Sequence, residues 1–263
     1  MSPFQNPSTM KSTIFYLVVV LLFNHSYKPQ TQTSRIEVVQ PTIENEATSV
    51  WRTINDISFF EEHGYQVNLP KDPLIDTLVT KSRNGTFGNE DFSAIRTLLE
   101  TNVFQEKDYL LAIQKVTNQT DFLNELINEI DIKKGNWDWN FKMFKTYKVV
   151  LTLYGSGGSY DPNDGIITLL TNKTGGFMKY KNPAYTIIHE ITHMGMEDSI
   201  VRRYHLPHGL KERLVDTFVS LMFQEKLPGY KMQTMGDERI DKYLTTESDI
   251  RTLDKILSNF LGE

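Results

Sequence analysis

The sequence contains no cysteine among its 263 residues. This absence excludes disulfide bonds, thiolate zinc sites and cysteine nucleophiles. Any bound metal ion must therefore take its ligands from histidine and carboxylate side chains. A chain without thiols also suits passage through an oxidising compartment.

Large blocks of positive charge are missing as well. The formal net charge is −5, so nucleic acid is not an expected partner. Hydrophobic residues make up 39% of the chain and charged residues 23%, which is the composition of a globular protein rather than a disordered one. The length allows one catalytic domain with a helical accessory region.

The longest apolar run lies near the N-terminus. Lys11 precedes ten apolar residues, 14–23 (IFYLVVVLLF), in the order of the first two regions of a secretory signal. The run is short for a membrane span, which needs about 20 residues, and no A-x-A cleavage site follows it. Residues 27–34 are polar and lack periodicity, as linkers do. We therefore expect residues 1–34 to be a signal-like segment and linker.

The expected location follows from this segment. The protein is predicted to be exported, and therefore secreted, periplasmic or attached to a membrane through residues 14–23. A buried apolar segment is the alternative interpretation of the same run.

Residues 35–135 are predicted to be mostly helical. Apolar residues recur there at spacings of three and four, the periodicity of an amphipathic helix. The expected helices are residues 43–63, 73–81, 89–102, 106–116 and 120–132. This region carries no motif for catalysis or binding, so its aromatic and leucine residues are assigned to a core.

The periodicity changes after Gly135. Residues 147–154 (YKVVLTLY) and 165–171 (GIITLLT) are rich in β-branched residues and predict two strands. The glycine-rich residues 155–159 between them are interpreted as a hairpin tip. Residues 166–171 are the candidate for an exposed edge strand, which would bind an extended peptide by adding it to the sheet.

The motif H-E-x-x-H follows, as His189-Glu-Ile-Thr-His193, within a segment that predicts a helix beginning near Pro183. Residues four apart lie on the same face of a helix, so two neutral imidazoles can close on one Zn²⁺. Glu190, between them in sequence, would reach a water at the metal ion. Ordinary buried histidines and a chance match are the competing interpretations.

A catalytic zinc site commonly has three protein ligands. Residues 208–223 predict a second helix, and a helix returning antiparallel to the first would bring Glu212 to the metal ion. Asp216, one turn further on, would then accept a hydrogen bond from the second nitrogen of a ligand histidine. His208 and His205 remain alternative third ligands, and an ordinary acid in the first turn of a helix is the competing interpretation of Glu212.

HEITH followed by E-x-x-x-D on the next helix resembles the gluzincins, the thermolysin-like clan of zinc metallopeptidases. The resemblance covers roughly residues 183–223. It implies one Zn²⁺ per chain held by His189, His193 and Glu212, Glu190 as catalytic base, and Asp216 as hydrogen-bond partner of a ligand. It also implies hydrolysis of a peptide or protein substrate by a water that the metal ion activates.

The sequence departs from the clan at three places. Lys211 precedes Glu212, where the clan often has asparagine. The aminopeptidase signature G-x-M-E-N is absent, so an endopeptidase is favoured over an aminopeptidase. No histidine follows His208, so the downstream catalytic histidine of thermolysin-like enzymes has no clear counterpart.

Two questions stay open at this level. Tyr204, His205 and His208, between the two helices, are the candidates for a donor that stabilises the oxyanion. The alternative function is a non-catalytic, exported or membrane-anchored helical protein with a structural zinc site or a decayed peptidase site. A structural site would be closed by four protein ligands, for example with His208 added.

The expected fold is α+β. A mostly helical region, residues 35–135, precedes a short mixed or antiparallel sheet. The metal-binding helix and the antiparallel ligand helix then follow within a zincin-like catalytic region, residues 136–263.

Overall fold

The computed structural model describes residues 34–178 and 181–262. Thr33–Glu263 form one compact unit. In the described residues ten α-helices surround a four-stranded mixed sheet, which confirms the α+β class. The predicted signal-like run, residues 14–23, lies outside the described residues. Among those that are described, no helix combines the length and apolar character needed to cross a membrane.

The helices and strands have the following bounds. The strands are β1 (Arg35–Val39), β2 (Thr146–Thr152), β3 (Gly158–Asp161) and β4 (Ile166–Leu170). The α-helices are α1 (Ile43–Asn55), α2 (Ile57–Glu62), α3 (Pro73–Arg83), α4 (Phe92–Leu98), α5 (Leu110–Thr117), α6 (Thr120–Lys133), α7 (Ala184–Met196), α8 (His208–Phe223), α9 (Glu247–Ile250) and α10 (Leu253–Leu261).

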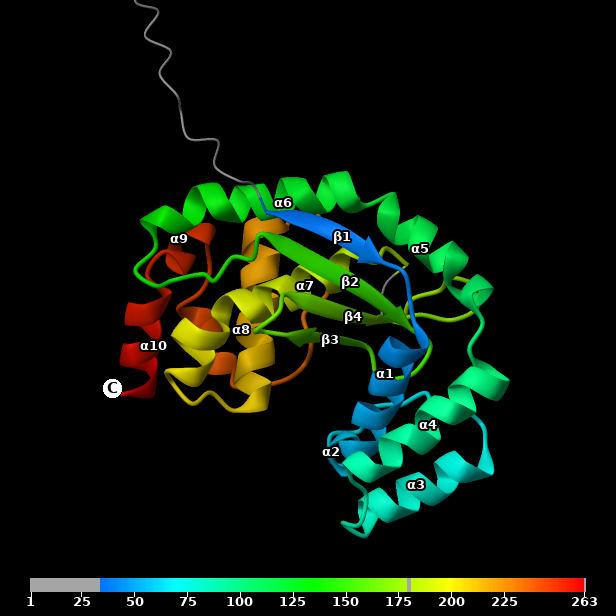
Figure 1. Cartoon of the computed structure of the whole chain (residues 1–263). Coiled ribbons are helices and arrows are strands. Elements are labelled where there is room, and N and C mark those ends of the chain that lie inside the picture. The colour runs from blue at the N-terminus through cyan, green and yellow to red at the C-terminus, as the bar shows by residue number, and fades with distance from the viewer. Residues whose placement is uncertain (1–33, 179–180, 263) are drawn as a thin grey trace, which may run out of the picture. The chain divides into compact units, whose positions relative to one another are not determined.

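The sheet has the strand order β1-β2-β4-β3. Strands β1, β2 and β4 run parallel, and β3 pairs with β4 antiparallel. The strands expected at residues 147–154 and 165–171 are β2 and β4. Strand β1 lies in the region predicted to be helical. The prediction missed this strand because its five residues (RIEVV) are too few to show a clear alternation. Figure 1 shows α5 and α6 along β1, and α7 beside β3 and β4.

Two predictions about the strands are wrong. Strand β4 lies between β2 and β3, so residues 166–171 are not an edge; β3 is the edge beside α7. The hairpin tip is not residues 155–159 but the turn from Asp161 to Gly165, closed by a bond from Gly165 N to Asp161 O of 3.2 Å. Strand β3 escaped prediction because its four residues (GSYD) include no β-branched side chain.

The predicted helices are present, and three of them are divided. The run 43–63 breaks at Asp56, whose N–H bonds to Arg52 O and ends α1. Residues 89–103 contain a 3₁₀ turn, α4 and a π turn in place of one helix. The run 106–116 separates into a 3₁₀ turn, Glu106–Tyr109, and α5.

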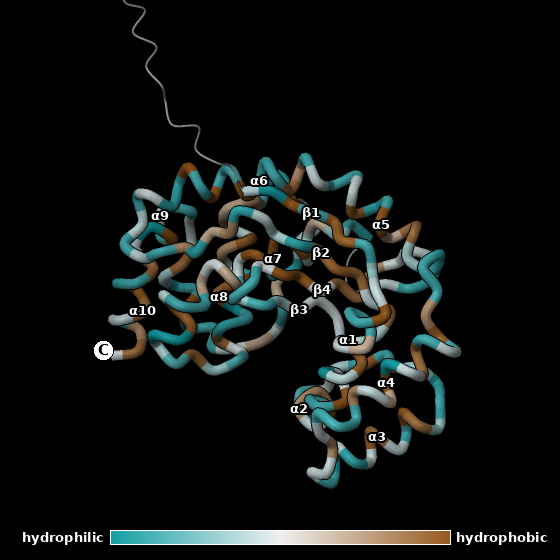
Figure 2. Tube along the Cα trace, in the orientation of Figure 1, coloured by the Kyte–Doolittle hydropathy of each residue, from teal (hydrophilic) through white to brown (hydrophobic). Residues whose placement is uncertain are grey.

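The core runs from the sheet into α7 and α8. Figure 2 shows apolar stretches of β2, β4 and α7 meeting inside the unit. Gly195 on α7 lets the chain before β2 pack closely, because a Cβ there would lie 2.1 Å from the ring of Phe141. Phe141 in turn stacks on Phe218 of α8 at 5.6 Å. These contacts fix the two helices that carry the predicted metal ligands.

Candidate metal centre

Helix α7 carries the HEITH motif in a buried position. It follows Pro183, whose carbonyl accepts the first bond of the helix from Ile187 N at 3.0 Å. The β-branched Ile187, Ile188 and Ile191 are fully buried, and this burial stabilises a helix of low intrinsic propensity. His189 and His193 are also buried, on the face that meets α8.

A short connection returns the chain to α7. A π turn at residues 197–202 follows the helix, and His205 takes a left-handed conformation with φ of 47° just before α8. Helix α8 packs on α7 and brings Glu212 to both histidines. Glu212 Oε1 lies 3.3 Å from His193 Nε2, and Glu212 Oε2 lies 3.4 Å from His189 Nε2. Glu212, the residue expected from the sequence to be the third ligand, therefore lies beside both histidines.

The three side chains fit a single metal ion. Their ligand atoms lie within 4.8 Å of one another, and the two histidine Nε2 atoms are 3.0 Å apart. Ligand atoms at about 2.0–2.1 Å from a tetrahedral zinc ion are separated by about 3.3 Å, close to the three distances observed here. Two imidazoles and a carboxylate are also a donor set of catalytic zinc sites. A buried group able to hold a metal ion, here called the metal-binding group, is thus present, whereas the geometry does not identify the metal.

Opposite charges are paired in this group. Burial would lower the pKa of His189, but hydrogen bonds to Asp216 and Glu212 raise it to about 10. Burial lowers the pKa of His193 to about 4. Burial would raise the pKa of Glu212, yet hydrogen bonds to both histidines hold it below the ordinary value. The pocket therefore favours positive charge beside a carboxylate that stays ionised.

Asp216 lies where the sequence predicted it. Its Oδ1 is 3.0 Å from His189 Nδ1, so it orients the imidazole through the nitrogen that faces away from Glu212. Tyr230 and Gln233, which lie in the loop after α8, complete this arrangement. Tyr230 Oη donates to Asp216 Oδ1 and lies 2.6 Å from His189 Nδ1. Gln233 donates its backbone N–H to Asp216 Oδ2 and its Nε2 to Glu212 Oε2.

His193 is held by packing rather than by a hydrogen bond at its second nitrogen. Within the described residues its Nδ1 is buried without a hydrogen-bond partner. The ring of Tyr160 on β3 lies parallel to the imidazole, with centroids 5.0 Å apart and an interplanar angle of 7°. Tyr160 Oη donates to Glu197 Oε2 at 2.9 Å, which ties β3 to the end of α7.

Gly158 lies against Glu190. A Cβ built on Gly158 would lie 2.3 Å from Glu190 Oε1 and 2.7 Å from Thr186 Cγ2. Only glycine therefore lets the edge strand approach the carboxylate this closely. Sequence reasoning missed this residue, together with Tyr160, Tyr230 and Gln233. Its signal was present, because a glycine inside a strand often marks a close approach of the backbone.

A cavity of about 540 Å³ opens at this group. His189, Glu190, His193 and Glu212 line one part of it. The rest of the wall brings together distant parts of the chain, namely Phe59, Phe60 and Tyr65 near α2, Leu169, Leu170, Phe177 and Met178 near the end of β4, and the glycine-rich residues 156–158. The metal-binding group thus faces a space within the size range of ligand-binding pockets.

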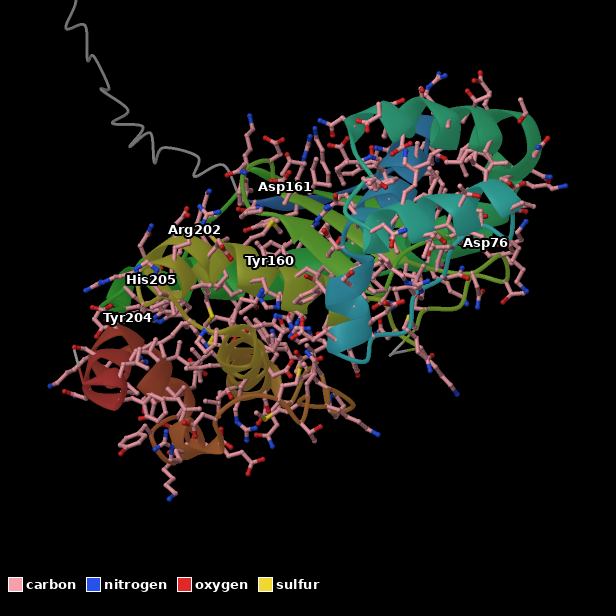
Figure 3. The ribbon with its side chains drawn as sticks, turned by 90° about the horizontal axis from the view of Figure 1, so that it is seen from below. Asp76, Tyr160, Asp161, Arg202, Tyr204 and His205 are labelled. Carbon is pink, nitrogen blue, oxygen red and sulfur yellow. The ribbon has the colours of Figure 1, made fainter. Side chains whose placement is uncertain are left out.

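The three candidate oxyanion donors have different positions. His208 lines the cavity, with Nε2 2.9 Å from Tyr65 Oη and Nδ1 3.7 Å from Glu212 Oε1. Tyr204 is buried elsewhere and donates to the carbonyl and carboxylate of Asp254. His205 is exposed at the turn, and Figure 3 shows it beside Tyr204 and away from Tyr160. The structure therefore does not bring Tyr204 or His205 to the metal-binding group.

Comparison with known proteins gives no further guide. No family model, curated protein or solved structure matches the chain.

Proposed function

We propose that the chain is a zinc-dependent peptidase of the gluzincin type. The observation that carries this proposal is the convergence of His189, His193 and Glu212 on the wall of a cavity, with Glu190 in the same wall. Zinc bound there would polarise a peptide carbonyl and make water a stronger nucleophile at neutral pH. An endopeptidase is favoured, because the aminopeptidase signature is absent from the sequence.

Each residue of the site has a role in this hydrolysis. Glu190 accepts a proton from the attacking water at its carboxylate and passes it to the leaving amine. Asp216 holds His189 through Nδ1 so that Nε2 faces the metal position. Tyr160 and Gly158 hold the edge strand against α7, beside both the base and a ligand.

The edge strand suits an extended substrate. Strand β3 pairs only with β4 among the described strands and borders the cavity through Gly158, Ser159 and Tyr160. A peptide adding to its outer side would form main-chain hydrogen bonds that do not depend on sequence. Its scissile bond would then pass Glu190 and the three ligands.

The structure supports an open site over a closed structural one. A structural zinc site has four protein ligands, and His208 was the residue that would have supplied the fourth. His208 does not belong to the group of converging ligand atoms, and its Nε2 is bonded to Tyr65. Three protein ligands beside a cavity leave a position for substrate.

The test separates metal binding from catalysis. The full chain and Glu190→Gln are assayed for zinc content and for cleavage of a mixed peptide library, with products detected by mass spectrometry. We expect both proteins to bind one zinc ion and only the wild type to cleave. Glu225→Gln, an exposed glutamate just after α8, is the matched control and retains both properties. Equal cleavage by Glu190→Gln in a clean preparation would contradict the proposal.

A further inference from the structure

Part of the cavity wall comes from a segment far from the HEITH motif. Tyr65 follows α2, and it lines the same cavity as His189, Glu190 and Glu212. It lies 143 residues before His208, its hydrogen-bond partner. Neither the motif nor the proposed ligands account for a tyrosine hydroxyl at this place.

The backbone on both sides of Tyr65 is fixed. Tyr65 N donates to Phe60 O at 2.8 Å, which holds the turn after α2. Three residues later Asn68 exchanges two backbone hydrogen bonds with Gly155, of 2.8 and 2.9 Å, and its side chain donates to Leu153 O. Because residues 155–157 lead directly into β3, the segment that carries Tyr65 is attached to the strand that covers Glu190.

Among the described residues, the phenol hydroxyl has one hydrogen-bond partner, His208. Tyr65 Oη lies 2.9 Å from His208 Nε2, and the imidazole is packed edge-on against Phe59 at 5.5 Å. The donor in this bond depends on the tautomer of His208. With the ring proton on Nε2, the imidazole donates to Tyr65 Oη, and the phenol proton is then available to another acceptor in the cavity.

The phenol keeps that proton in the presence of the site's carboxylates. Burial raises the pKa of Tyr65, and the charges of Glu212 and Glu190 raise it further. Tyr65 lines the same cavity as both carboxylates. A protonated phenol in this position is a hydrogen-bond donor rather than a base.

We propose that Tyr65 donates a hydrogen bond to the carbonyl oxygen of the scissile peptide bond, and that His208 is the positioning residue that orients its hydroxyl. This inference rests on the proposed peptidase function. When water adds to the carbonyl carbon, a C–O bond forms, one water proton moves to Glu190, and the carbonyl π electrons move to the oxygen. The Tyr65 O–H stays intact and stabilises the charge on that oxygen.

Two other polar residues of this wall, Lys211 and His208, have contacts of their own. Lys211 Nζ lies 3.7 Å from Glu212 Oε1 and 5.7 Å from the centre of the Tyr160 ring, on the α8 side of the cavity. His208 Nε2 is bonded to Tyr65 itself. Tyr65 therefore combines a fixed backbone, a phenol proton and a place in the wall of the cavity that Glu190 also lines.

The experiment measures an oxyanion-like probe at the metal position. The full-length wild type and Tyr65→Phe are loaded with Co²⁺, which accepts the same ligands as zinc and absorbs visible light. Acetohydroxamate, which chelates the metal through two oxygens, is titrated while the absorption is followed. We expect both proteins to bind one Co²⁺ per chain. The dissociation constant of the probe should rise about tenfold in Tyr65→Phe, because one hydrogen bond to an anionic oxygen is lost.

Tyr204→Phe is the matched control, since it removes a buried hydroxyl that bonds Asp254 outside the cavity. Its affinity for the probe should equal that of the wild type. His208→Ala should also weaken binding of the probe when Tyr65 is present. It should have no further effect on that binding in Tyr65→Phe, because His208 acts through the phenol. This second variant gives the answer on its own should Tyr65→Phe fail to fold.

Three results would overturn the inference. If both proteins bind Co²⁺ and the probe has the same affinity for Tyr65→Phe as for the wild type, Tyr65 is excluded as the donor. A large loss in Lys211→Met without a loss in Tyr65→Phe would assign the donor to Lys211. A folded wild type that binds no Co²⁺ would remove the metal centre itself, so failure of the proposed function is distinguished from failure of this inference alone.

Discussion

Two buried glutamates occupy different environments in this molecule. Glu46 lies where α1 packs on the end of β2, and Glu212 lies where α8 packs on α7. Their side chains are almost equally inaccessible, at 1% and 7% exposure. Glu46 accepts from the Tyr109 hydroxyl, the Thr152 hydroxyl and the backbone N–H of Leu153. Glu212 instead faces two imidazole nitrogens.

The difference in partners has an electrostatic consequence. Burial raises the pKa of Glu46, and its three hydrogen bonds from neutral donors only reduce that rise. The pKa of Glu212 is lowered despite burial, because hydrogen bonds from His189 and His193 favour its ionised form. Burial of a carboxylate alone therefore does not mark a functional site. Both Glu46 oxygens are taken by donors that tie α1 to the sheet, whereas Glu212 lies beside the two histidines that complete the metal-binding group.

The largest effect is expected at the junction between α1 and the sheet. Glu46→Ala leaves three buried donors without their acceptor and creates a cavity, so the free energy of unfolding should fall by about 3–5 kcal/mol. Urea denaturation measures this change. Glu46→Gln keeps an oxygen acceptor and should lose much less. Equal stability of Glu46→Ala and the wild type would show that Glu46 does not stabilise the junction between α1 and the sheet.

The next effect concerns the hydrogen bond behind His189. Asp216→Asn should weaken zinc binding about 10- to 100-fold, because the carboxylate no longer orients the imidazole and increases its basicity. Competition with a chelator of known affinity gives the dissociation constant. Asp241→Asn is the control. Asp241 pairs with Arg213, which lies on α8 as Asp216 does, and it contacts none of the proposed ligands. Unchanged affinity in Asp216→Asn would show that His189 is oriented by other contacts.

A smaller effect is expected where β3 meets Glu190. Gly158→Ala places a methyl group within contact of Glu190 Oε1, so the carboxylate must move. We expect zinc to be retained. Peptide cleavage should fall about tenfold, because the proton acceptor is no longer well placed. Gly135→Ala meets no atom within 4 Å and serves as the control. Full activity in Gly158→Ala would mean that the approach of β3 is not needed.

The smallest effect is a pH dependence of stability at Glu46. A raised pKa in the folded state means that the contribution of this group is fully present below its unfolded pKa and is lost as the pH rises through the folded pKa. The stability of the wild type relative to Glu46→Gln should therefore fall as the pH rises above the ordinary pKa of a glutamate, about 4.3. Denaturation at several pH values tests this. A constant difference would show that Glu46 has no raised pKa.

The sequence predicted the parts of the site that are local. HEITH needs only helical spacing to bring two histidines together, and Glu212 needs only an antiparallel return of the next helix. Buried isoleucines and leucines gave both helices a readable periodicity. The α+β class followed from the change of that periodicity after the N-terminal helices.

The remaining residues depend on packing between distant segments. Tyr65 reaches His208 because the turn after α2 pairs with Gly155, and no local pattern encodes that contact. Tyr230 and Gln233 lie in a loop without helical or strand periodicity, and their partners are defined only once α8 is in place. The strand GSYD carries no alternation, so its place at the edge came from the sheet order alone.

Zinc content tests the central claim most directly. Wild type, Glu212→Ala and Glu46→Gln are purified in full length, supplied with zinc, freed of excess and measured by elemental analysis. The account predicts one zinc ion per chain in the wild type and in Glu46→Gln, and much less in Glu212→Ala. A folded wild type without zinc, or a Glu212→Ala variant that binds as much as the wild type, would contradict it.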